Sequence, residues 1–182
     1  MTHAAAVTGH TAGIGLAISE MLGESGYDVR GFSRSTGHEL PQAVDRIVDE
    51  ADDCDVFVNN AFVYHDFTQV ELLYKLYLRW NEIEGKTIIN ISSRAGDFSN
   101  SGRIDGYSMI KHALDTASRQ LSNVRQSKCR VVNIKPGWVD TASVRSVDVF
   151  KLAPQDVAEA VGWILERPSR VYVTSISLQP MG

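Results

Sequence analysis

The chain has 182 residues, 43% of them hydrophobic and 22% charged, which is ordinary for one globular domain. Lysine and arginine number 18 against 22 acidic residues, a net charge of −4, so neither nucleic acid nor an anionic membrane is expected as a partner. No apolar run is long enough to span a membrane, and the first residues lack a secretory signal pattern. Cys54 and Cys129 lack metal-ligand spacing and suit inert thiols, so we expect a cytoplasmic protein.

Short apolar segments alternate with helical patterns along the chain. The expected strands are 3–9, 27–33, 54–61, 86–93, 129–137 and 171–178, and the expected helices are 13–26, 40–53, 68–83, 107–125 and 154–166. Strands that are apolar throughout and alternate with helices predict a parallel sheet covered on both faces. We therefore expect one three-layer α/β domain over 1–182, with ligands bound at the carboxyl ends of the strands.

The segment VTGHTAGIG, residues 7–15, joins the first expected strand to the first helix. Glycines at positions 9, 13 and 15 would let the backbone approach a pyrophosphate closely, and a helix amino terminus offers free N–H groups. A glycine turn needed only for helix packing is the alternative. The strand–loop–helix context favours dinucleotide binding.

The end of the second strand carries Ser33, Arg34 and Ser35 and no carboxylate. An acidic residue there would bind a ribose 2′-hydroxyl and repel a 2′-phosphate. An arginine fork suits a phosphate, although a solvated surface arginine is the alternative. The pattern favours NADP(H) over NAD(H).

Tyr107 is followed by Lys111 four residues later, one helical turn away. A free tyrosine has a pKa near ~10, and a nearby cation would lower it toward neutrality by favouring the phenolate. Ser93 ends the preceding expected strand and could donate to a substrate oxygen, with Ser92 as its rival. The alternatives are a tyrosine and a lysine on a solvated helix, and two hydroxyls that cap a turn.

Five motifs, TGHTAGIG, NNA (59–61), NISSRAG (90–96), YSMIK (107–111) and PGWVDT (136–141), occur in the order of the short-chain dehydrogenase/reductase family. The chain resembles that family almost from end to end. The resemblance implies a Rossmann-type doubly wound sheet and an NAD(P)-dependent oxidoreductase for a small carbonyl or alcohol substrate. It implies that Ser93 positions the substrate, that Tyr107 is the general acid/base, and that Lys111 binds the nicotinamide ribose and tunes Tyr107.

The resemblance also implies a set of cofactor contacts. They are Gly9, Thr11, Gly13, Ile14, Gly15, Ser33, Arg34, Asn59, Asn60, Ala61, Ile91, Tyr107, Lys111, Pro136, Gly137, Val139 and Thr141. A purely structural role is the alternative for one of the two asparagines, and core packing is the alternative for the two isoleucines.

Three departures from the family pattern stand out. The segment before NNA is shortened, so that one helix usual in the family is missing. The asparagine that relatives use in a proton relay is absent, and counting back from Ser93 reaches His65, which could shuttle a proton or lie in solvent. The stretch 142–153, usually a substrate lid, is brief; it suggests an open site, a small or exposed substrate, or walls from another subunit.

The alternative function is a non-catalytic dinucleotide-binding redox sensor or scaffold, because a fold alone does not set function. Retention of serine, tyrosine and lysine favours the enzyme, and a nucleotide-sugar epimerase or dehydratase ranks last. Helices 68–83 and 107–125 resemble the family's dimer interface, with Leu72, Leu73, Leu76 and Trp80 as its apolar face. We expect a homodimer or homotetramer, with burial inside the monomer as the alternative for this face.

Overall fold

The sheet of this computed structural model, which describes residues 3–97, 106–144 and 148–181, is parallel throughout. Its strands lie in the order β2-β1-β3-β4-β5-β6. Their bounds are β1 (Ala4–Thr8), β2 (Asp28–Phe32), β3 (Val56–Asn59), β4 (Thr87–Ile91), β5 (Arg130–Pro136) and β6 (Ser175–Leu178). The α-helices are α1 (Gly13–Glu24), α2 (Val44–Ala51), α3 (Thr68–Trp80), α4 (Tyr107–Ser122) and α5 (Pro154–Leu165).

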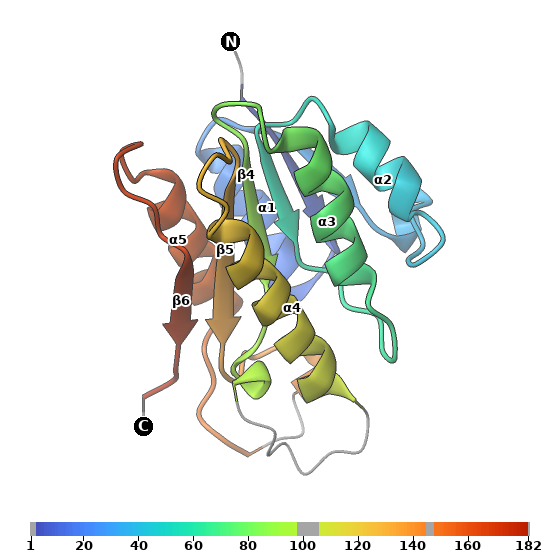
Figure 1. Ribbon diagram of the computed structural model, residues 1–182. Helices are drawn as coiled ribbons and strands as arrows, with labels where there is room; N and C mark the ends of the chain where they lie inside the picture. Colours follow the sequence, from blue (N-terminus) through green and yellow to red (C-terminus); the bar gives the residue numbers. More distant parts are fainter. Residues whose placement is uncertain (1–2, 98–105, 145–147, 182) are drawn as a thin grey trace.

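The helices cover both faces of the sheet. Figure 1 shows α2, α3 and α4 on one face and α1 and α5 on the other. The side chains of each strand alternate between the faces, so that Ile88 joins the core under α2, α3 and α4, whereas Ile89 joins the core under α1 and α5. The expected three-layer α/β fold is therefore confirmed.

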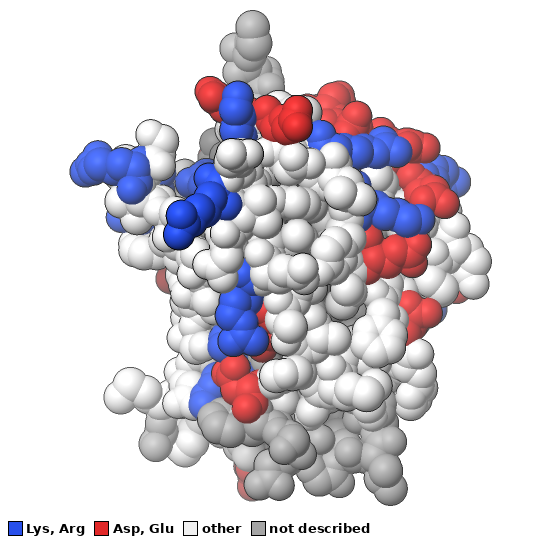
Figure 2. Space-filling view, in the orientation of Figure 1, with Lys and Arg blue, Asp and Glu red and all other residues white. Residues whose placement is uncertain are grey.

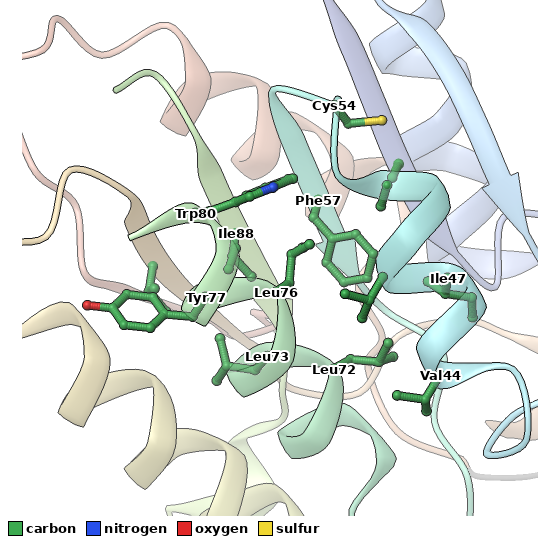
Figure 3. Packing of buried hydrophobic residues seen from close by; sticks show 14 of the residues in the cluster. Val44, Ile47, Cys54, Phe57, Leu72, Leu73, Leu76, Tyr77, Trp80 and Ile88 are labelled. Atoms are coloured by element: carbon green, nitrogen blue, oxygen red, sulfur yellow. The ribbon is translucent and has the colours of Figure 1, made fainter. Parts of the chain in front are cut away.

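The core under α2, α3 and α4 is the part that anchors the helices next to the candidate site. Figure 3 shows Phe57 of β3 among side chains that α2 and α3 contribute, with Trp80 at the end of α3. Phe57 and Trp80 are both fully buried. Large buried side chains of this kind typically stabilise the fold by about 1.5–3 kcal/mol each, so α3 is held firmly against the sheet.

The element boundaries that differ most from the sequence-based expectation are the starts of α2 and β6. Helix α2 begins at Val44 rather than at residue 40, because residues 41–43 form turns in which the Ala43 N–H donates to the carbonyl of Glu39. Strand β6 begins at Ser175 rather than at 171. The Tyr172 hydroxyl lies 2.9 Å from the Val131 nitrogen and 3.2 Å from the Val131 carbonyl oxygen, and so satisfies backbone groups that a longer strand would pair with.

The chain reverses its direction of travel across the sheet at β1. From β1 it crosses to β2 on one side and then to β3 on the other, so the switch point lies at the carboxyl ends of β1 and β3. Between β2 and β3 the chain forms a one-turn 3-10 helix, η1 (Arg34–Thr36), and α2. The order 3-2-1-4-5-6 common in dinucleotide-binding sheets has one more strand beyond the second. The described sheet ends at β2 on this side, so the segment between β2 and β3 is short and lacks that strand, whereas the sequence pattern predicted a missing helix.

Candidate functional site

The glycine loop between β1 and α1 has a backbone that only glycine allows. Gly9 has a φ of +71° and Gly13 a φ of +55°, values in the left-handed region that side chains disfavour. A Cβ on Gly15 would lie 2.1 Å from the carbonyl oxygen of Gly9. Ala12 precedes the helix and supplies no side-chain cap, so the first-turn N–H groups of α1 remain available to an anion.

Asn59, the last residue of β3, and Asn60, which follows it, have different roles. Asn59 is fully buried, and its amide donates to the carbonyl of Gln69 at 2.7 Å and to the side-chain oxygen of Asn90 at 2.9 Å. Asn60 donates instead to the carbonyl of Thr8 at 2.9 Å and lies 3.0 Å from the position of a Cβ on Gly9. Asn59 thus braces β3 against α3 and β4, and Asn60 supports the glycine loop.

The end of β2 presents a cation and hydroxyls. Arg34 is exposed at the start of η1, and the hydroxyls of Ser33 and Ser35 lie 2.8 Å apart beside it. The Ser33 N–H donates to the Thr36 hydroxyl at 2.9 Å, which fixes the turn. The turn therefore holds Arg34 and two hydroxyls at the edge of the sheet that carries the glycine loop.

The two candidate serines point to different surroundings. Ser92 is 3% exposed, and its hydroxyl donates to the carboxylate of Asp115 in α4. Ser93 is half-buried and caps a one-turn 3-10 helix, η2 (Arg94–Gly96), by accepting from the Ala95 N–H at 3.1 Å. A hydroxyl already committed to the half-buried carboxylate of Asp115 is poorly placed to bind substrate, which leaves Ser93 as the better candidate.

Tyr107 and Lys111 lie one turn apart on α4, on the side of the helix that faces the sheet. The Lys111 amine is 5.8 Å from the centre of the Tyr107 ring and 4.9 Å from that of Phe62. The Phe62 and Tyr107 rings meet edge to face, with centres 5.0 Å apart. Lys111 is only 3% exposed, so the lysine is a buried group and not part of a solvated helix surface.

Burial lowers the pKa of Lys111 to about 7, because a charged amine loses its hydration there, and the charge of Asp115 opposes this shift. The amine donates to the side-chain oxygen of Gln69 at 2.7 Å and to the carbonyl of Ile91 at 2.9 Å. The charge on Lys111 is therefore sensitive to pH near neutrality.

Sequence reasoning missed Gln69. It stands in α3 three and four residues before Leu72 and Leu73, on the buried stripe of the helix, where it is 2% exposed. A polar residue at a core position was the available signal. His65, reached by counting along the sequence, instead lies exposed in a turn with a φ of 61°, and Gln69 is the polar side chain that the structure places on Lys111.

The chain after β5 returns to the glycine loop. A Cβ on Gly13 would lie 3.1 Å from the methyl group of Thr141, so this threonine packs against the loop. The Gly137 N–H donates to the carbonyl of Leu178 at 2.9 Å. Pro136 is the last residue of β5, and Val139 is 5% exposed.

The remaining predicted cofactor contacts differ in accessibility. Thr11 is exposed, whereas Ile14 and Ala61 are half-buried. Ile91 is 3% exposed within the core under α1 and α5, and its carbonyl accepts from the Lys111 amine, so little of this residue is free to meet a ligand. Of the brief stretch 142–153, residues 145–147 lie outside the described residues, and 142–144 form a one-turn helix.

The apolar face of α3 is buried inside the chain, so the prediction that it forms an interface is wrong and the alternative, burial inside the monomer, holds. Leu72, Leu73, Leu76 and Trp80 are all fully buried in the core of the chain itself. Side chains of α2 and β3 already cover this stripe (Figure 3), so it is not free to meet a second copy. Figure 2 shows lysine, arginine and acidic side chains interspersed toward the α2 side, where Lys75 pairs with Asp45 at 2.6 Å.

None of the described helices has the length and apolar character needed to cross a membrane. Within 3–97, 106–144 and 148–181, no group of histidine, cysteine and acidic side chains is arranged to hold a metal ion.

Sequence comparison relates part of the chain to uncharacterized oxidoreductases. No family model matches the sequence. An uncharacterized oxidoreductase of Staphylococcus aureus strain MW2 is 38% identical over 99 residues, which are 52% of this chain and 42% of that protein. An uncharacterized oxidoreductase of Staphylococcus saprophyticus is 35% identical over 98 residues. The chain thus spans less than half of the length of these relatives.

Structural comparison covers the whole chain at low sequence identity. A short-chain dehydrogenase of Burkholderia cenocepacia, solved with NADP, is 20% identical with a TM-score of 0.79 and covers 100% of this chain and 89% of its own. The serine dehydrogenase of Escherichia coli is 23% identical with a TM-score of 0.70, over 95% of both chains. These structures show that the chain has the fold of short-chain dehydrogenases, as the sequence resemblance implied.

Proposed function

We propose that the protein is an NADP(H)-dependent oxidoreductase of the short-chain dehydrogenase/reductase type, with Tyr107 as general acid/base. The observation that carries the proposal is the buried Lys111 beside Tyr107, at the edge of the sheet that also bears the glycine loop. Burial lowers the pKa of Lys111, and residues with shifted pKa values cluster at functional sites. A buried lysine next to a tyrosine therefore supports a functional pair.

The glycine loop fits a dinucleotide. The backbone of the loop 9–15 packs so closely that a Cβ on Gly15 would clash with it, and we call this loop the cradle. It leads into the uncapped amino terminus of α1, an arrangement that suits a pyrophosphate. Arg34, Ser33 and Ser35 supply a cation and hydroxyls for a 2′-phosphate. Neighbours of the same fold solved with NADP or NADPH support this assignment.

The bound nicotinamide would supply or accept the hydride. The protein's part is to move a proton and to stabilise charge on the substrate oxygen. In carbonyl reduction, the Tyr107 hydroxyl would give its proton to that oxygen, and the Ser93 hydroxyl would donate a hydrogen bond to it. A charged Lys111 would stabilise negative charge on the Tyr107 oxygen.

We propose a small carbonyl or alcohol as the substrate and the cytoplasm as the location. A homodimer or homotetramer remains our proposal, although its interface cannot be the buried stripe of α3. The exposed apolar side chains of α3 and α4 outside that stripe, Leu78 and Met109, are 71% and 60% exposed. They are the alternative place for a contact between copies.

Two measurements test the function. NADPH and NADH are titrated by fluorescence, and NADPH oxidation is then screened with small aldehydes, ketones and quinones. We expect NADPH binding and turnover, with kcat reduced ~10²–10⁴-fold in Tyr107→Phe. If NADPH binds without turnover, and Tyr107→Phe does not change that binding, the redox sensor is favoured. If neither cofactor binds, both the enzyme and the sensor are ruled out.

A further inference from the structure

The Lys111 amine has two polar acceptors on neighbouring elements. They are the side-chain oxygen of Gln69 on α3, at 2.7 Å, and the backbone carbonyl of Ile91 on β4, at 2.9 Å. Both side chains are enclosed, since Gln69 is 2% exposed and Lys111 is 3% exposed. The contact is therefore a buried hydrogen bond to an ionisable group, which is stronger than its equivalent in water.

The orientation of the Gln69 amide is fixed from the other side. Its nitrogen donates to the backbone carbonyl of Asn59 at 2.9 Å, and the backbone carbonyl of Gln69 accepts from the side chain of Asn59 at 2.7 Å. A flipped amide would turn its N–H groups toward the amine and its oxygen toward the Asn59 carbonyl, so it would lose both hydrogen bonds. Asn59 thus sets which end of Gln69 meets Lys111.

We infer that Gln69 is a positioning residue, which holds the Lys111 amine beside Tyr107 and stabilises its charged form. The inference rests on the proposed function and adds to it a specific group that acts on the lysine. A hydrogen bond to the ammonium favours the protonated state, so Gln69 opposes the effect of burial. Removing this acceptor would leave less of Lys111 charged at neutral pH, and the phenolate of Tyr107 would lose its support.

The groups around the Lys111 amine allow the effect of Gln69 on its titration to be separated from the effect of nearby charges. Among the described residues, the titratable groups that face Lys111 are Tyr107 and Asp115, both on its own helix. The neighbouring elements contribute the neutral amide of Gln69, the carbonyl of Ile91 and the ring of Phe62, 4.9 Å from the amine. A change at Gln69 therefore alters the titration of Lys111 without removing a charge.

The first test measures the lysine itself, in the full chain without cofactor. The protein is labelled with ¹³C at the lysine ε-carbon, the Lys111 signal is assigned by its loss in Lys111→Met, and its titration is followed by NMR. We expect a midpoint near 7 in the wild type and a downward shift of roughly one to two pH units in Gln69→Leu. Gln69→Glu places a carboxylate on the amine and should raise the midpoint.

An exposed glutamine provides the matched control. Gln120 lies on the surface of α4 and accepts from the Tyr74 hydroxyl at 2.6 Å, away from Lys111. Gln120→Leu should leave the Lys111 midpoint unchanged. A midpoint that is also unchanged in Gln69→Leu would overturn the inference. If Gln69→Leu does not fold, an unchanged midpoint in Gln69→Glu would overturn it as well.

The second test is the pH dependence of kcat with NADPH. We expect the alkaline limb of the wild-type profile to move to lower pH in Gln69→Leu and to higher pH in Gln69→Glu, in parallel with the lysine midpoints. A merely structural role would lower kcat equally at every pH. Failure of the proposed function would appear differently, as absence of NADPH binding and turnover in the wild type, and would overturn the catalytic part of the inference.

Discussion

Ser92 and Ser93 are neighbours in the sequence, but their hydroxyls make different bonds: that of Ser92 donates to the half-buried carboxylate of Asp115, and that of Ser93 accepts from the Ala95 N–H. Successive side chains of an extended segment point to opposite sides. One hydroxyl is therefore used in packing α4 onto the sheet, and the other lies half-buried at the end of β4.

The serine pair gives a matched test. Ser93→Ala should lower kcat roughly 100-fold, as expected for loss of one donor to a developing oxyanion. Loss of its cap on η2 should lower the free energy of unfolding by about 0.5–2 kcal/mol. Ser92→Ala leaves Asp115 with one hydrogen bond fewer and should lower the free energy of unfolding by about 1–3 kcal/mol. Steady-state kinetics and denaturant unfolding check both variants, and the reverse pattern would assign the substrate to Ser92.

Two glycines of α1, Gly15 and Gly23, allow the requirement of the glycine loop to be tested apart from helix stability. Gly15→Ala would bring a Cβ to 2.1 Å from the carbonyl oxygen of Gly9 and 2.6 Å from the Asn60 amide, so we expect loss of NADPH binding. Gly23→Ala meets nothing within 4 Å. It should stabilise the fold by roughly 0.5–1 kcal/mol through helix propensity. Fluorescence titration and thermal unfolding measure the two effects, and unimpaired NADPH binding by Gly15→Ala would contradict the cradle.

Arg34 should decide between the two dinucleotides. Arg34→Ala removes a charge-assisted contact to the 2′-phosphate, so NADPH affinity should fall roughly 10- to 100-fold, while NADH affinity should change little. Arg125 is also exposed, beyond the end of α4, and Arg125→Ala serves as the control for loss of one positive charge. Equal losses for NADPH and NADH in Arg34→Ala would remove the role assigned to this arginine.

Burial of Lys111 should make the fold more stable as pH rises from 7 to 9. The pKa of Lys111 is about 7 in the folded chain, below its ordinary value of 10.5. Between these values the unfolded chain binds more protons than the folded one, so the free energy of unfolding increases with pH. Below pH 7 both states carry the charge, and the cost of burying it is fully present.

Lys111→Met should lack this contribution. Denaturant unfolding at pH 7 and pH 9 should show a larger rise for the wild type than for the variant. The window ends near pH 9 because burial raises the pKa of Cys54 to about 11 and that of Cys129 to about 12, and these thiols destabilise the fold at higher pH. Equal pH dependence in the wild type and in Lys111→Met would contradict the lowered pKa.

The alternation of strands and helices could be predicted because periodicity reports directly on burial. The glycine loop could be predicted because its spacing and context are local. What covers an apolar stripe cannot be predicted in this way, because the covering residues are distant in the sequence. The stripe of α3 that begins at Leu72 faces the core of the chain and not a second chain. Gln69 was missed for the same reason, since its partners, Lys111 and Asn59, are 42 and 10 residues away.

Asp115 has a consequence for how this fold tolerates change. Its carboxylate accepts from Ser92 at the end of β4 and from Asn133 of β5, the latter at 2.7 Å, and so fixes how far α4 can slide along the sheet. These two hydrogen bonds therefore help to fix where α4, which begins at Tyr107, lies relative to the end of β4, which Ser93 follows. The connection between β2 and β3 can therefore be short without changing how α4 is placed on β4 and β5.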